Sequence, residues 1–286
     1  MKIKDIRVLL VGLGNWGKNH SKTLKALPCK SIEYDKSFAI KDMSEEFVHP
    51  NPVNYDAVII ATTSSTHFEL TKKYWLEGKH VLCEKPVVKN KEELDELVSL
   101  VRSRPHQVFM AGHTMLFNGA IEKISKVSPR GDFILRRMKY NPIDGDDEVY
   151  RLIPHDLSIL DHTTKMIDKM EFSINKNFVK FQSELCEYKG NIQVSWWQYP
   201  PIRDVYVNVC GFQYYFNDYN EIFTKDGCSL EYDKTPPLLK EQMRFLELIA
   251  GDSCNNPVDI SHTERVYTVL TNLKKWEPWT PQSKTI

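Results

Sequence analysis

The sequence contains no long apolar run. Nowhere do about 18 apolar residues follow one another, as a helix that crosses a membrane would require. The first residues, Met1–Arg7, carry a charge before each short apolar stretch, unlike a secretory signal peptide. We therefore expect a soluble, cytoplasmic protein that does not bind membranes.

Net charge and paired cysteines are missing as well. The 38 Lys and Arg residues balance 38 Asp and Glu residues, so no long-range field attracts nucleic acid, and we expect no nucleic-acid partner. The six cysteines are scattered and form no C-x-x-C pair, so neither a zinc site nor a redox pair has support. We expect reduced thiols and no metal ion.

The length of 286 residues exceeds one ordinary domain, so two domains are expected. In the first domain, apolar runs alternate with amphipathic stretches, a pattern typical of a parallel sheet covered by helices on both faces. The expected strands are Ile6–Val11, Ala57–Ala61, His80–Cys83 and Val108–Ala111. The expected helices are Trp16–Leu27, Thr66–Glu77 and Lys91–Arg102.

After about Phe117, strand-like runs follow one another directly, which predicts a mostly antiparallel sheet. These runs are Phe133–Tyr140, Glu171–Ile174, Phe178–Cys186, Ile192–Trp197, Asp204–Val209 and Gln213–Phe216, with Lys189–Asn191 interpreted as a turn. Helices are expected at Leu238–Ile249 and Ser261–Trp276. The predicted fold is α/β: an N-terminal Rossmann domain with a doubly wound parallel sheet (residues 1–117) and a C-terminal α+β domain with an open, mostly antiparallel sheet (residues 118–286).

A glycine-rich motif follows the first predicted strand. Its residues, which fit G-x-G-x-x-G and lead into a helix, are Gly12, Leu13, Gly14, Asn15, Trp16 and Gly17. The glycines allow a tight turn and close approach of a dinucleotide pyrophosphate, and Asp35 ends the next strand-like run, where an acid binds ribose hydroxyls. The alternative is a glycine turn beside a solvated aspartate. Because a carboxylate repels a 2′-phosphate, the motif predicts NAD; Lys36 and Ser37 soften this preference, so NADP stays open.

The segment Gly78–Pro86, GKHVLCEKP, resembles the G-K-H-V-x-x-E-K-P signature of the glucose-fructose oxidoreductase / inositol dehydrogenase (GFO/IDH/MocA) family. Other stretches resemble this family along nearly the whole chain: Ala61–His67, Gly112–Asn118, Pro154–Leu160 and Pro237–Ile249. The resemblance implies a cofactor-binding Rossmann domain and a second domain whose open sheet forms the substrate wall and the interface of a homodimer or homotetramer.

The resemblance also implies hydride transfer between a sugar C–H and nicotinamide C4, with the nicotinamide between Lys85 and His155. Besides the glycine motif and Asp35, the cofactor-binding residues implied are Thr62, His67, Glu84 and Lys85. The substrate-binding residues implied are Lys85, His113, Arg151 and His155. The residues themselves are compatible with this chemistry, because oxidation of an alcohol needs a base near neutral pKa, which a lysine or histidine supplies. The alternative to a catalytic role is that Lys85 is a solvated loop lysine and that His155 caps or packs its helix.

Two features depart from the family. Arg151 stands where the family usually has an aspartate, four residues before His155, and only twenty residues separate Asp35 from Asp56, so the adenine side of the cofactor site should be reduced. Arg151 suits a carboxylate or phosphate, which predicts an anionic substrate such as a uronic acid or a nucleotide sugar of surface-glycan synthesis. Alternatively, Arg151 pairs with an acid of the run Asp144–Glu148. Both departures favour a rival hypothesis, a catalytically silent member that binds dinucleotide or sugar and acts through protein contacts.

Aromatic side chains gather in the second domain, at Trp196–Tyr199 and Tyr214–Phe216. On strands of an open sheet such residues pack a subunit interface more often than they stack on a sugar. Self-association through this sheet is therefore expected.

Overall fold

The computed structural model describes residues 1–35, 55–127, 131–140, 148–175, 178–183, 188–195, 197–209 and 211–274. They belong to two compact units. Unit 1 comprises Met1–Asn118 and Lys234–Glu264, and unit 2 comprises Gly119–Asp233 and Arg265–Ile286. Within the described ranges, every helix is too short or too polar to cross a membrane.

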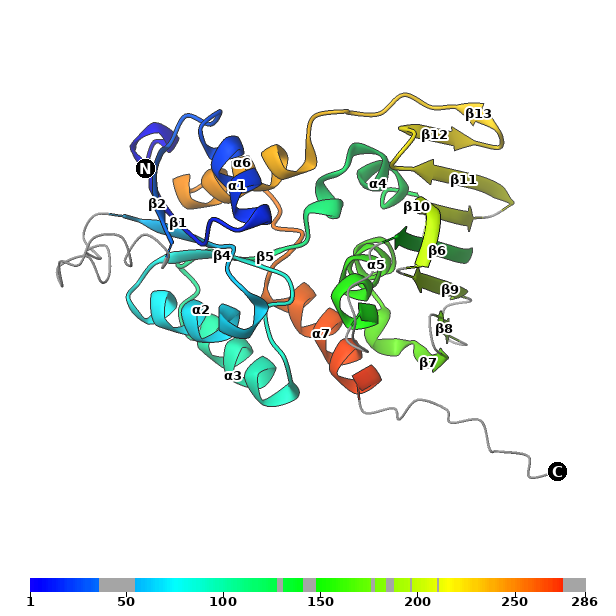
Figure 1. The fold of residues 1–286 in the computed structure, drawn as a ribbon, viewed down its shortest axis with the longest axis horizontal. Helices are drawn as coiled ribbons and strands as arrows, with labels where there is room; N and C mark the ends of the chain where they lie inside the picture. The colour runs from blue at the N-terminus through cyan, green and yellow to red at the C-terminus, as the bar shows by residue number, and fades with distance from the viewer. Residues whose placement is uncertain are drawn as a thin grey trace. The chain divides into compact units, whose positions relative to one another are not determined.

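The sheet of unit 1 has five parallel strands in the order β2-β1-β3-β4-β5 (Figure 1). Their bounds are Arg7–Val11 (β1), Lys30–Tyr34 (β2), Ala57–Ile60 (β3), His80–Glu84 (β4) and Phe109–Gly112 (β5). All residues of β3 and β5 are buried, as are all but the first of β1 and β4. Strands buried on both faces have continuous apolar sequences, which explains why the pattern located them.

Helices cover both faces of this sheet. Helices α1 (Asn15–Leu24) and α6 (Pro237–Ala250) lie on one face, and α2 (His67–Leu76) and α3 (Lys91–Arg102) lie on the other (Figure 1). Short 3-10 turns are η1 (Ile3–Asp5), η4 (Ser64–Thr66) and η5 (Thr114–Phe117). The predicted Rossmann fold is confirmed.

Unit 2 is built on an eight-stranded sheet in the order β13-β12-β11-β10-β6-β9-β8-β7. The bounds are Gly131–Tyr140 (β6), Glu171–Asn175 (β7), Phe178–Ser183 (β8), Tyr188–Ser195 (β9), Trp197–Val209 (β10), Phe212–Asn217 (β11), Ile222–Lys225 (β12) and Cys228–Ser229 (β13). Among the described strand pairs of this sheet, only that of β6 with β9 is parallel, so the predicted mostly antiparallel sheet is confirmed.

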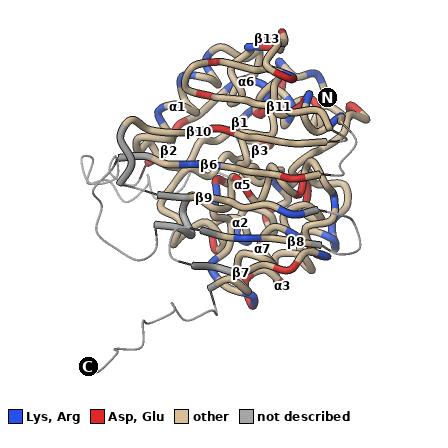
Figure 2. The backbone as a smooth tube through the Cα atoms, turned by 90° about the vertical axis from the view of Figure 1, so that its right-hand side faces the viewer, with Lys and Arg blue, Asp and Glu red and all other residues tan. Residues whose placement is uncertain are grey.

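One face of this sheet carries α4 (Gly119–Ile124) and α5 (Glu148–Thr164), and the opposite face is turned toward the viewer in Figure 2. The turn η6 (Ile167–Lys169) follows α5, and α7 (Ile260–Lys274) begins in unit 1 and continues in unit 2. Alternate residues of β6 point to the helix-covered face, where Phe133 and Leu135 are buried. The alternation of polar and apolar residues along this strand therefore matches a sheet with one covered face.

The interpretation of Lys189–Asn191 as a turn is wrong, because these residues lie inside β9. Gly190 is opposite Phe133, and a Cβ at this glycine would lie 2.0 Å from the carbonyl oxygen of Phe133 and 2.8 Å from Cζ of Phe181. The glycine therefore makes room for a close approach of strand and ring, and it does not mark a reversal of the chain.

The division of the chain at residue 118 also needs correction. The first crossing between units falls there, but residues 234–264 return to unit 1. The reason is a set of long-range contacts: Gln242 of α6 donates to His20 of α1 at 2.8 Å, and Thr114 donates to Glu241 at 3.0 Å. Contacts between residues so far apart leave no local pattern in the sequence.

Candidate functional site

The glycine motif forms a tight turn between β1 and α1. Gly12 has φ of 96°, and its N–H donates to the carbonyl of Tyr34 at 2.8 Å. A Cβ at Gly12 would lie 2.7 Å from the carbonyl oxygen of Ala61, and one at Gly17 would lie 2.0 Å from that of Gly12. Both glycines are thus required by backbone packing, whether or not a ligand is bound.

Gly14 differs from these two glycines. It is the N-cap of α1, with φ of −63° and ψ of −171°, and a Cβ there would meet no atom within 4 Å. No side chain caps α1, and its first turn, which starts at Asn15 and Trp16, contains no acid. The helix N-terminus is therefore open to an anion, since its first N–H groups and its dipole favour negative charge.

Asp35 lies directly after β2, beside this turn. Its Oδ2 accepts a hydrogen bond of 2.7 Å from the N–H of Leu13. The carboxylate is therefore held next to the glycine turn, as the spacing of the motif predicts. Residues 36–54, which include Lys36 and Ser37, lie outside the described residues.

Glu84, the last residue of β4, has a buried carboxylate. Its Oε1 accepts from Nε1 of Trp16 and contacts Nε2 of His20 at 2.9 Å, and its Oε2 accepts from the N–H of Lys85 at 3.2 Å. Gly112 on the neighbouring strand makes room for the group, because a Cβ there would lie 2.9 Å from Cα of Glu84. The carboxylate thus joins the glycine turn to the main chain of Lys85.

A second buried acid, Glu241 of α6, lies close enough to sense this charge. Burial, and then the negative charge of Glu84, raise the pKa of Glu241 well above its ordinary value. Burial also opposes ionisation of Glu84, but its hydrogen bond and charge interaction with His20 hold its pKa below the ordinary value. The two shifts are opposite in direction, so the site favours the ionised form of Glu84 and the protonated form of Glu241. His20 and Glu241 were not among the candidates from sequence, since their partners lie far along the chain.

His67, at the start of α2, is almost completely buried. Its Nδ1 lies 2.8 Å from the carbonyl oxygen of Pro86, and its Nε2 lies 3.1 Å from that of Thr62. The hydroxyl of Thr62 contacts that of Thr66 at 2.8 Å. The imidazole therefore contacts two main-chain segments at the carboxyl edge of the sheet.

Lys85 follows β4 at the same edge and is partly exposed, and its peptide bond to Pro86 is cis. The carboxyl edge of a parallel sheet is where open α/β folds bind ligands. His113, which follows β5, is only 1% exposed and lies edge-on to His262, with ring centroids 5.5 Å apart. Lys85 thus reaches solvent, whereas the imidazole of His113 is enclosed.

In unit 2, His155 lies on α5 and is partly exposed. The helix begins at Glu148, so Pro154 lies inside it, and Arg151 is one helical turn before His155. The side chain of Arg151 and the run Asp144–Asp147 lie outside the part of the chain that the structure describes.

Asp156, the neighbour of His155, forms a buried ion pair. Asp156 lies in the middle of α5 and accepts two hydrogen bonds from Arg137 of β6, at 3.0 and 3.1 Å. The side chains of Arg137 and Asp156 are 6% and 2% exposed. This buried ion pair fixes the rotation of α5 against the sheet and therefore the direction in which the neighbouring His155 extends.

One group of possible metal ligands occurs near the end of α6. Ligand atoms of Glu247, Asp252 and Cys254 lie within 4.8 Å of one another. Nε of Arg244 already pairs with Glu247 at 3.2 Å, so the local negative charge is partly neutralised.

Comparison with known proteins gives one family match and several distant relatives. Residues 6–113 match the GFO_IDH_MocA model, described as an oxidoreductase family with an NAD-binding Rossmann fold. The chain is 28% identical over 166 residues to UDP-N-acetylglucosamine 3-dehydrogenase of Acidithiobacillus ferrooxidans, which covers 54% of this chain and 53% of that protein. It is 24% identical over 139 residues to myo-inositol 2-dehydrogenase of Thermotoga maritima, which covers 44% and 41%. The matches thus span about half the length of these curated relatives.

Solved structures resemble the chain over nearly its whole length. UDP-N-acetylglucosamine 3-dehydrogenase of Acidithiobacillus ferrooxidans superposes with a TM-score of 0.79 at 20% identity, covering 94% of this chain and 96% of that one. A 3-ketoreductase of Actinomadura kijaniata, solved with TDP-benzene and NADP, gives 0.72 at 13% identity, covering 94% and 96%. At these identities the comparison shows the fold.

Proposed function

Since residues 6–113 belong to the GFO/IDH/MocA oxidoreductases, a family with an NAD-binding Rossmann fold, we propose that the protein is an NAD(P)-dependent dehydrogenase or reductase acting on a sugar derivative. The observation that carries the proposal is the turn from Gly12 to Gly17, which opens an uncapped helix N-terminus next to the carboxylate of Asp35. The pyrophosphate would lie at this N-terminus, and Asp35 would accept hydrogen bonds from the ribose hydroxyls. A carboxylate there favours NAD over NADP.

Nicotinamide supplies the hydride acceptor at C4 when the cofactor is bound. In the oxidation of a secondary alcohol to a ketone, the cofactor would take the hydride, and the hydroxyl proton would go to a base of the protein. We assign the proton transfer to Lys85 and His155. Both are partly exposed, Lys85 at the ligand-binding edge of the unit 1 sheet and His155 on α5 of unit 2.

Nucleotide sugars are the substrates that we propose. Support comes from the relative named as a UDP-N-acetylglucosamine dehydrogenase and from the 3-ketoreductase solved with a TDP compound. Arg151 adds a chemical reason, because a guanidinium has only donors and pairs with phosphate or carboxylate in a bidentate manner. The backbone of α5 supports a shared role for Arg151 and His155, which are four residues apart on one helix.

Arg151→Met is expected to raise the KM for UDP-N-acetylglucosamine about 10-fold or more, as a lost charged hydrogen bond of about 1.5–3 kcal/mol would do. Steady-state kinetics with NAD⁺ measure this. An unchanged KM, or full activity of the wild type on the neutral polyol myo-inositol, would leave Arg151 as a structural residue.

Cofactor binding is tested by titrating NADH against the wild type and Gly14→Val, followed by protein fluorescence. We expect the variant to bind NADH at least about 10-fold more weakly, because a side chain at this position blocks pyrophosphate approach. Its melting temperature should fall less than that of Gly17→Ala, since a Cβ at Gly14 meets no protein atom within 4 Å. Gly17→Ala is the contrasting variant, expected to melt earlier because of the 2.0 Å approach to Gly12. Equal affinities of wild type and Gly14→Val would rule out this cofactor site.

The second candidate function is that of a catalytically silent member of this family, which binds dinucleotide or sugar without turnover. It is favoured by Arg151 in place of an acid and by the short interval between Asp35 and Asp56. A thermal-shift screen that crosses NAD(H) and NADP(H) with nucleotide sugars, combined with turnover assays, separates the two candidates, because bound ligands stabilise the native state. Stabilisation without turnover of any sugar would favour the silent member.

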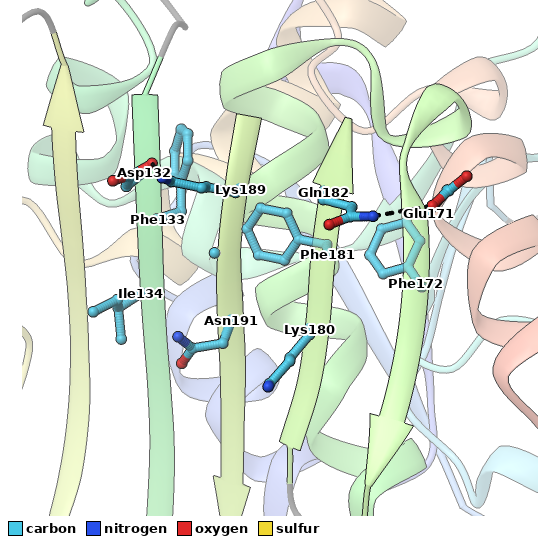
Figure 3. A pocket seen from close by; sticks show the side chains of 11 residues that line it. Asp132, Phe133, Ile134, Glu171, Phe172, Lys180, Phe181, Gln182, Lys189 and Asn191 are labelled. Atoms are coloured by element: carbon cyan, nitrogen blue, oxygen red, sulfur yellow. Dashed lines mark hydrogen bonds and ion pairs between the residues drawn. The ribbon is translucent and has the colours of Figure 1, made fainter. Parts of the chain in front are cut away.

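Self-association is proposed through the open face of the unit 2 sheet. A row of side chains crosses this face, each opposite the next across neighbouring strands: Thr224, Tyr215, Tyr206, Ile134, Asn191 and Lys180. Tyr206 and Tyr215 are 4.4 Å apart between ring centroids, and Tyr206 and Ile134 are 37% and 39% exposed. Figure 3 shows Ile134, Asn191 and Lys180 on three neighbouring strands. These residues line a pocket of about 870 Å³. Exposed aromatic and aliphatic side chains gathered on one face of a sheet are typical of an interface.

Sedimentation at micromolar concentration is expected to show a dimer or tetramer for the wild type and a smaller species for Tyr206→Glu, because the introduced carboxylate would be desolvated in the interface. Tyr219→Glu, at a tyrosine that is 44% exposed between β11 and β12, is the control and should sediment like the wild type. A wild type that remains monomeric would contradict the proposal.

A further inference from the structure

His67 contacts two carbonyl oxygens, one with each ring nitrogen, at 2.8 Å (Pro86) and 3.1 Å (Thr62). A carbonyl oxygen only accepts hydrogen bonds, so each nitrogen fulfils this arrangement only as an N–H donor. The imidazole is 2% exposed, so solvent does not replace either bond.

The two carbonyls belong to segments that leave neighbouring strands. Thr62 follows β3, Pro86 follows β4, and these strands pair in parallel, so both segments emerge at the carboxyl edge of the sheet. His67 connects them from the first turn of α2. The histidine therefore fixes the spacing of two loops at the edge where the proposed chemistry takes place.

Lys85 lies between two residues that buried groups hold in place. On one side, the carboxylate of Glu84 accepts from the N–H of Lys85 at 3.2 Å and is itself bound by Trp16 and His20. On the other side, the carbonyl of Pro86 contacts His67 at 2.8 Å. The lysine side chain is partly exposed, so its direction depends on the main chain from which it extends.

We propose that His67 is a positioning residue for Lys85, acting through the hydrogen bond from its Nδ1 to the carbonyl of Pro86. The inference rests on the proposed catalytic role of Lys85. It replaces direct cofactor binding by His67, because both ring nitrogens already face main-chain oxygens and the ring is enclosed.

Two substitutions separate the two bonds of His67. The amide nitrogen of His67→Asn takes the place of Nδ1 and keeps a donor for Pro86. The longer side chain of His67→Gln places its amide nitrogen near Nε2, which keeps a donor for Thr62 and removes the one for Pro86. Each variant removes the contact to one of the two carbonyls, so their melting temperatures should fall by similar amounts.

Two readouts report on Lys85. Competitive acetylation with acetic anhydride, analysed by peptide mass spectrometry, gives the reactivity of Lys85 relative to Lys89, an exposed lysine of the same segment. The kcat for UDP-N-acetylglucosamine with NAD⁺ gives its function. We expect His67→Gln to change the relative reactivity by about threefold or more and to lower kcat by about tenfold or more, whereas His67→Asn lowers kcat by about threefold or less.

The outcomes are distinguishable. Equal reactivity of Lys85 in the wild type and both variants, or equal losses in both variants that follow their melting temperatures, would overturn the positioning role. A wild type that binds no NADH and oxidises no nucleotide sugar would overturn the proposed function instead. In that case the acetylation contrast between His67→Gln and His67→Asn still decides whether His67 orients Lys85.

Discussion

Lys85→Met is expected to lower the rate of UDP-N-acetylglucosamine oxidation by about 10² or more, the usual contribution of a positioned acid or base. Methionine keeps much of the length of the lysine stem but accepts no proton, so the loss is assigned to the amine. NADH formation, followed by absorbance, measures the rate. Affinity for NADH should change little, as expected for a group that handles the substrate proton.

The control is Lys89→Met, which removes an exposed lysine four residues away and should leave the rate at the wild-type value. His155→Ala is expected to lose as much as Lys85→Met, and His162→Ala, two turns further along α5, is its matched control. If a variant of Lys85 or His155 keeps the wild-type rate, the residue replaced in it has no catalytic role.

Asp156→Ala is expected to lower the free energy of unfolding by about 3–5 kcal/mol, because it leaves the guanidinium of Arg137 buried without its partner. Arg137 would lose both hydrogen bonds that it donates to Asp156, and its side chain is only 6% exposed. Urea unfolding, followed by far-UV circular dichroism, measures the change.

Asp218→Ala is the matched control for this ion pair. Asp218 pairs with Arg203 at 2.8 Å, but their side chains are 21% and 36% exposed, so the expected loss is about 1 kcal/mol or less. The double variant Arg137→Met, Asp156→Leu should recover most of the stability, because two apolar side chains need no compensating charge. An Asp156→Ala protein as stable as Asp218→Ala would show that the Arg137 charge is solvated in unit 2.

Local patterns predicted the elements that obey local rules. The helix Lys91–Arg102 was predicted with the bounds that the structure has. In the structure, the side chain of Asn90 caps it by accepting from the N–H of Glu93. The helix expected at Leu238–Ile249 extends one residue further at each end, from Pro237 to Ala250, and ends at Gly251 in the left-handed conformation. Capping residues and apolar periods are properties of neighbouring residues, so a single sequence contains them.

Only part of the candidate site could be predicted from the sequence. The glycine turn and Asp35 follow a spacing rule, and the structure brings them together through the bond from Leu13 to Asp35. The contacts of Glu84 with Trp16 and His20 join residues more than sixty positions apart, and no local rule selects them. Pro154 lies inside α5, although proline is usually tolerated only in the first turn of a helix, and its neighbours Ile153 and Leu157 are buried.

The return of residues 234–264 to unit 1 has a consequence for protein synthesis. His20 is fully buried and is hydrogen-bonded by Gln242, so the nucleotide-binding half has an incomplete interior until α6 has left the ribosome. Unit 1 therefore finishes folding after most of unit 2 has been synthesised, although its first strand precedes unit 2 in the sequence. A fragment that stops at Asn118 would expose the face of α1 that α6 covers, whereas a fragment in which residues 1–118 are joined to 234–264 would contain the whole unit.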